Sequence, residues 1–151
     1  METNNNKNTA AMIHLSALSQ YVLPFGNFIL PIIIWSSNKD KSEFVDAQGK
    51  QAINFQLSLF LYSLVLCLIA IPIFFVTVLK NMSADSFFEN GDWIIKNLHL
   101  GNVSGMVVVC IMAVILFCTL KVAEFFLIIY ASVKTSNGED FKYPITISFL
   151  K

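Results

Sequence analysis

The chain has 151 residues, no net formal charge and a mean hydropathy of +0.65. Hydrophobic residues make up 56% of it and charged residues 13%, against about 45–50% and about 25% in a typical soluble domain. This composition excludes a disordered chain and a basic nucleic-acid-binding surface, and it indicates an integral membrane protein of one domain.

Residues 2–9 are polar, and the sequence predicts a flexible tail over 1–10. The first apolar segment, 11–36, is long enough to cross a hydrocarbon core of ~30 Å as a helix. Four residues that disfavour a straight helix interrupt it: Pro24, Gly26, Asn27 and Pro31. We therefore expect a broken span packed against other protein, and a re-entrant hairpin is the alternative.

Charged residues are densest in 37–52, which predicts a connecting loop with Asp46 as the N-cap of the next helix. That helix, 54–79, is the clearest predicted span, because the run from Leu57 to Leu79 carries no charge. Pro72 is its one strong breaker.

Residues 80–102 are polar again and predict a second loop. Within it, Trp93 and the apolar residues of 93–100 favour a short helix at the membrane interface. A third span is predicted over 106–134, ending at a C-cap formed by Asn137-Gly138. The tail beyond it alternates apolar and polar residues as a strand does, which predicts an extended strip.

The predicted fold class is therefore an all-α integral membrane protein with three transmembrane helices, about 11–36, 54–79 and 106–134, in a single polytopic domain 11–151. Lysine is enriched in the first loop and the C-terminal tail, which places both in the cytoplasm of a bacterial inner membrane. A spanning first segment then puts the N-terminus outside, whereas a re-entrant one puts it inside.

Lys121 and Glu124 are the two charges inside a predicted span, and their spacing of three places them on one helix face. An intramembrane pair of this kind can be a proton or ion relay. It can also be a structural pair, a contact with a partner helix, or a pair near the boundary with the lysine reaching the interface.

No enzymatic, cofactor or metal motif occurs in the chain. The cysteines Cys67, Cys110 and Cys118 are scattered in apolar runs and are expected to behave as small buried hydrophobes. His14 and His99 are far apart, with no ligand spacing around them. We therefore expect no catalytic residue, no cofactor, no metal site and no nucleic-acid partner.

Three segments together resemble a known family: HLSALSQYVLPFGNFILPIIIW (14–35), FVDAQGKQAINFQLS (44–58) and NGEDFKYPITISFL (137–150). They are similar to the bacterial membrane domain of unknown function grouped with the chloroplast Tic import component of about twenty kilodaltons. That relative resembles a channel or scaffold subunit of a protein-import complex. The positions that carry the resemblance are Pro24, Phe25, Gly26, Asn27, Phe44, Asp46, Gly49, Asn54, Tyr143 and Pro144, for which we expect structural roles.

From these features we expect an accessory or scaffold subunit of a larger inner-membrane complex, with other integral membrane subunits as partners and a link to protein translocation. The alternative is a small transporter or ion-conducting oligomer that uses Lys121 and Glu124.

Overall fold

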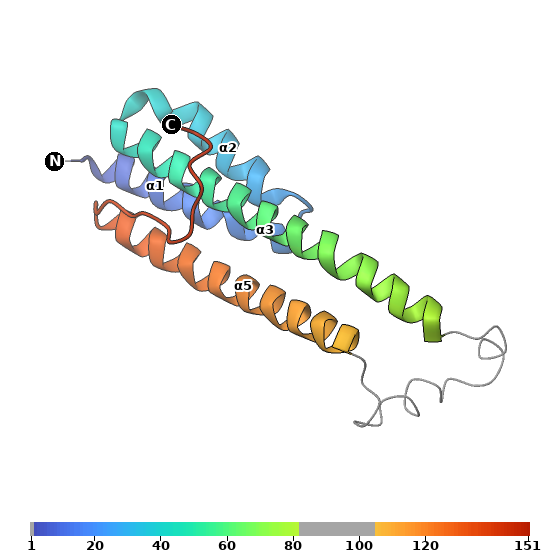
Figure 1. The fold of residues 1–151 in the computed structure, drawn as a ribbon. Helices are drawn as coiled ribbons and strands as arrows, with labels where there is room; N and C mark the ends of the chain where they lie inside the picture. The colour runs from blue at the N-terminus through green and yellow to red at the C-terminus, as the bar shows by residue number, and fades with distance from the viewer. Residues whose placement is uncertain (1, 82–104) are drawn as a thin grey trace. The chain divides into compact units, whose positions relative to one another are not determined.

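A computed structural model describes residues 2–81 and 105–151, and Figure 1 shows its helices. In chain order they are α1 (Asn4–Ser16), the 3-10 turn η1 (Ala17–Tyr21), α2 (Gly26–Asn38), η2 (Lys39–Lys41), α3 (Glu43–Asn81) and α5 (Gly105–Ser136). The described part of the chain contains no β-strand, so the predicted all-α class is confirmed there. The predicted interfacial helix at 93–100 lies outside the described residues.

Two described segments, not three, are long and apolar enough to cross a membrane: Glu43–Val76 and Ile111–Ser136. The predicted first span over 11–36 is wrong, because the chain reverses within it. Phe25 adopts a left-handed conformation with φ 60°, and Gly26 begins α2. Helices α1 and α2 then pack against each other as a hairpin (Figure 1). Each has 13 residues and is about 20 Å long, too short to span.

Residues 1–10 were predicted to be a flexible tail, but α1 already begins at Asn4. The Thr3 side chain caps it by accepting a hydrogen bond of 3.3 Å from the Asn6 N–H. Further along the helix, Ala10 and Ala11 are buried, and the Ser132 hydroxyl of α5 donates to the Ala11 carbonyl at 3.2 Å. Small residues on α1 thus let two helix backbones approach closely.

Helix α3 begins at Glu43, well before the predicted start at residue 54. Ser42, not Asp46, occupies the N-cap position, and its hydroxyl accepts from the Phe44 N–H at 3.1 Å. The helix continues through Pro72 and has 39 residues. Of the predicted loop over 37–52, residues 43–52 therefore form the first turns of this helix, whereas residues 39–41 form η2.

Helix α5 closely matches the predicted third span, and the predicted C-cap is confirmed. Gly138 has φ 84°. Its N–H donates to the Thr135 carbonyl at 3.0 Å, and the Glu139 N–H donates to the Lys134 carbonyl at 3.1 Å. These two hydrogen bonds form a Schellman motif. The tail that follows is extended but forms no strand. Its alternation fails at Ile145, which has φ 58° and is 80% exposed.

The chain divides into two compact units. The first, residues 1–61 and 120–151, contains the hairpin, the start of α3, the end of α5 and the tail. Its buried core joins Ile13 of α1 to Val45 and Ala52 of α3, with Ile34 and Trp35 of α2 packed against them. The second unit, residues 62–119, includes the remaining parts of α3 and α5.

Candidate functional site

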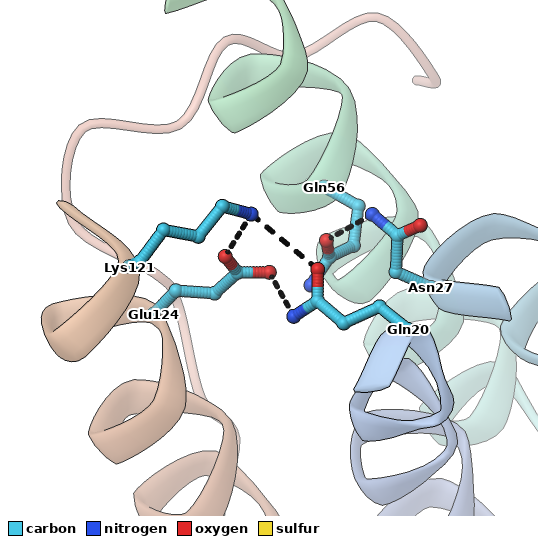
Figure 2. A network of polar contacts seen from close by, with 5 residues as sticks. All are labelled: Gln20, Asn27, Gln56, Lys121 and Glu124. Carbon is cyan, nitrogen blue, oxygen red and sulfur yellow. Dashed lines mark hydrogen bonds and ion pairs between the residues drawn. The ribbon is translucent and has the colours of Figure 1, made fainter. Parts of the chain in front are cut away.

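Lys121 and Glu124, the two charges in the apolar stretch of α5, form an ion pair, with Lys121 Nζ 2.8 Å from Glu124 Oε2. The Glu124 side chain is 1% exposed and that of Lys121 is 38% exposed. Gln20, from the hairpin, contacts both: its Nε2 donates to Glu124 Oε1 at 2.9 Å, and its Oε1 accepts from Lys121 Nζ at 3.4 Å (Figure 2). A single amide therefore complements both charges.

A second polar contact lies beside this triad in Figure 2. Asn27 Nδ2, near the start of α2, donates to Gln56 Oε1 of α3 at 2.9 Å. Gln56 is 1% exposed, and its Nε2 has no hydrogen-bond partner among the described residues. We call the five residues together the polar cluster: Gln20, Asn27, Gln56, Lys121 and Glu124.

The polar cluster fastens the hairpin to the two long helices. Glu124 lies 12 residues before the end of α5 at Ser136, or about 18 Å along the helix. A carboxylate at such a depth in an apolar segment is costly unless it is paired. The amides at the inner end of the hairpin supply the missing partners, so the hairpin contributes to the stability of α5.

The opposite end of α2 is anchored by Trp35. Its indole Nε1–H donates to Asp46 Oδ1 at 2.9 Å, and Lys39 Nζ lies 5.4 Å from the ring centroid. The ring also lies directly against Gly49 of α3, where a Cβ atom would collide with it. Tryptophan beside charged groups is typical of the membrane–water interface.

The C-terminal tail is held by side chains of α3. Asn54 accepts from the N–H groups of Phe149 and Leu150 at 3.2 and 2.8 Å through Oδ1 and donates to the Leu150 carbonyl at 3.0 Å. The Ser58 hydroxyl accepts from the Ile147 N–H at 2.8 Å. These bonds replace the strand partner that the alternating pattern would otherwise need.

Tyr143 locks the start of this tail into the helical unit. Its ring stacks on Phe55 with 3.9 Å between centroids, and its hydroxyl lies 2.9 Å from His14 Nδ1. His14 Nε2 lies 3.3 Å from Gln48 Oε1, and Gln48 Nε2 donates to Asp140 Oδ1 at 3.3 Å. If His14 is neutral with its hydrogen on Nε2, each of these three hydrogen bonds joins one donor to one acceptor.

Burial sets the charge state of both ends of this contact. It lowers the pKa of His14 from 6.5 to about 4, while the hydrogen bond to Gln48 works in the opposite direction. Burial also raises the pKa of the Tyr143 hydroxyl well above its usual range, and the Glu124 carboxylate adds to this shift. The pair is therefore uncharged at neutral pH.

The ten positions singled out from the sequence gather in the hairpin, at the start of α3 and in the tail. Asn27, Asp46, Gly49, Asn54 and Tyr143 make the contacts given above. Gly26 is buried against Ser19, and Phe44 is also buried. Pro24 lies in the hairpin turn with Phe25, and Pro144 in the turn before Ile145. The sequence interpretation did not identify Gln20 and Gln56 as site residues. The one feature that could have indicated them is that each is a polar residue in an apolar run.

The remaining candidates do not form a site. Within residues 2–81 and 105–151, no three His, Cys, Asp or Glu side chains come together as metal ligands. Cys67 and Cys118 are free thiols on exposed helix faces, so the expected burial is wrong for them. The Cys110 side chain and His99 lie outside the part of the chain that is described.

Replacing Lys121 by Leu leaves the buried Glu124 carboxylate without its counter-charge. We expect a loss of about 1–3 kcal/mol of unfolding free energy, less than for a fully buried pair because Lys121 is 38% exposed. The double variant Lys121→Leu/Glu124→Leu should recover most of this loss. Thermal unfolding in mild detergent measures both, with Lys134→Leu as the control on the same helix. Strictly additive losses would contradict the coupling.

His14 predicts a fall in stability on acidification. Below pH 6.5 the unfolded chain takes up a proton on this imidazole, whereas the folded chain does not until about pH 4. Stability therefore decreases as the pH falls through this window, by about 3 kcal/mol in full. His14→Gln should flatten the dependence in thermal unfolding between pH 7 and 4.5. His99 and the carboxylates are common to both proteins, so equal slopes would show that His14 does not titrate as stated.

One comparison identifies the chain's family. The model of the MamF/MmsF family, described as the magnetosome magnetite crystal formation protein family, matches residues 5–150. No curated protein and no solved structure matches the chain. The assignment overturns the resemblance to the Tic import component, which was wrong, and removes the support for a role in protein translocation. Since the match covers nearly the whole sequence, the chain belongs to the MamF/MmsF family of magnetosome membrane proteins.

Proposed function

We propose that the chain is a non-enzymatic accessory protein of a magnetosome membrane, and that it supports magnetite crystal formation as a scaffold for other integral membrane proteins. The family description supports the link to crystal formation. The observation that carries the scaffold role is the internal pairing of Lys121, Glu124 and Gln20. These groups complement one another and fasten the hairpin to α5.

The alternative, transport through the Lys121–Glu124 pair, has less support. A proton relay needs polar or ionisable groups at intervals across the whole bilayer. Residues 63–76 of α3 and 108–118 of α5 contain no Asp, Glu, Lys or His. A relay that ended at Glu124 would have no continuation along these two helical segments.

The surface that would meet a partner is apolar. Ile147 and Phe149 of the tail are 41% and 48% exposed, although the backbone around them is fixed by Asn54 and Ser58. The tail thus presents apolar side chains on a rigid support, which suits docking against another membrane subunit.

The size of the magnetite crystals provides the test. In a magnetosome-forming bacterium that lacks its own member of the family, expression of this chain should restore the size distribution of the magnetite crystals seen by electron microscopy. Glu124→Gln, which keeps hydrogen-bonding atoms at this position, should restore it equally at the same membrane level. A wild-type chain that reaches the membrane but leaves the crystals unchanged would contradict the proposal. A proton or ion flux in liposomes that Glu124→Gln abolishes would favour the transporter.

The hairpin also changes the proposed orientation. With two spans, both termini lie on one side of the membrane, together with seven of the ten lysines, Lys7, Lys39, Lys41, Lys50, Lys134, Lys142 and Lys151. Lys80, near the end of α3, lies on the other side, and Lys121 lies within the span. The excess of lysine assigns the termini to the cytoplasm.

Thiol labelling tests this orientation. In a chain whose three cysteines are replaced by Ser, a membrane-impermeant maleimide should reach Glu2→Cys and Lys151→Cys from the same side of the membrane. It should reach Asn81→Cys, at the end of α3, only from the opposite side. Labelling of the two termini from opposite sides would restore a spanning first segment and rule out the two-span arrangement.

A further inference from the structure

The turn between α1 and α2 exposes a set of large apolar side chains. Tyr21, Val22, Leu23 and Phe25 are 61%, 83%, 54% and 66% exposed. No Asp, Glu, Lys or Arg occurs between Lys7 and Lys39, and His14 is buried with a lowered pKa. An exposed apolar turn on a segment free of formal charge calls for an apolar environment around it.

The length of the hairpin limits how deep this turn can reach. Ten residues separate Phe25 from Trp35, or about 15 Å of helix. A bilayer with its headgroups is ~40–45 Å thick, so one leaflet is about 20 Å thick. A turn 15 Å from the level of Trp35 thus lies within one leaflet.

The hairpin cannot swing away from the long helices, because both of its ends are tied to them. Asn27 bonds to Gln56 at the inner end, and Trp35 bonds to Asp46 at the outer end. The Phe28 ring also meets that of Phe60 edge to face, with 6.0 Å between centroids. The outward face of α2 remains open, with Ile29 and Ile33 51% and 54% exposed.

We propose that the α1–α2 hairpin is a wedge in a single leaflet, and that its turn and the outward face of α2 bind the acyl chains of that leaflet. Because the hairpin is confined to this leaflet, its two helices add cross-sectional area there and none to the other leaflet. At about 10–12 Å per helix diameter, the hairpin adds roughly 200 Å² to one leaflet. A difference of this sign bends the bilayer with the hairpin leaflet on the convex side. The chain therefore has a membrane-shaping function besides its scaffold role.

The depth of the turn is the first test. Single-cysteine chains carrying a fluorophore at Val22→Cys, or at Ser36→Cys as the control near Trp35, are reconstituted in phosphatidylcholine vesicles. Nitroxide lipids labelled deep in the acyl chain should quench Val22→Cys more than headgroup nitroxides do, and the order should reverse for Ser36→Cys. Stronger quenching at Val22 by aqueous iodide, or disulfide-linked dimers of the unlabelled Val22→Cys chain, would overturn the proposal by assigning the turn to water or to a second copy.

Vesicle shape is the second test. Chains inserted from detergent into large vesicles with both termini outside should reduce the mean vesicle diameter. Val22→Asn/Phe25→Asn should lose this reduction, whereas Val22→Leu/Phe25→Leu, the matched apolar control, should keep it. Asn adopts positive φ readily, so the left-handed turn at residue 25 tolerates it. If the Asn variant shrinks vesicles as much as wild type at equal incorporation, the hairpin does not bend the membrane.

Discussion

A buried carboxylate in an apolar helix is the constraint on which the rest of this fold depends. Glu124 is 1% exposed, and its partners are Lys121 on its own helix and Gln20 from the hairpin. Without an opposite charge and a hydrogen-bond donor, such a group destabilises the helix that carries it. The hairpin therefore stabilises α5 through a polar contact, in a place where apolar packing gives little specificity.

The need to pair buried polar groups also explains how α1 and the C-terminal tail are held. Side chains of α3 at 48, 54 and 58 satisfy groups that secondary structure leaves open: the imidazole of His14 and the backbone of the tail. A tail that found these partners in a strand would need a second extended segment, and none exists in the described residues. Polar side chains of α3 thus bind α1 and the tail. Other positions of the helix expose apolar side chains such as Leu61.

The long helices were predictable because each carries a continuous apolar run, and the C-cap at Gly138 was predictable because only a left-handed residue closes a helix in this way. The hairpin was predictable only as an alternative. Pro24 and Gly26 indicate a break, but whether the chain resumes its direction or reverses depends on tertiary partners such as Gln56, which lies 29 residues beyond Asn27. Gln20 illustrates the same limit, since its partner is 104 residues away.

The start of α3 shows why composition misleads near a membrane surface. Residues 43–50 are charged enough to suggest a loop, yet Asp46 and Lys50 pair at i,i+4 on one helix face, 2.6 Å apart. Asp46 also accepts a hydrogen bond from the Trp35 indole. A charged residue that seems to belong to a loop therefore holds the end of α2 against the start of α3. A protein with two spans can thus place six polar anchors, Gln20, Asn27, Trp35, Asp46, Asn54 and Tyr143, in one unit.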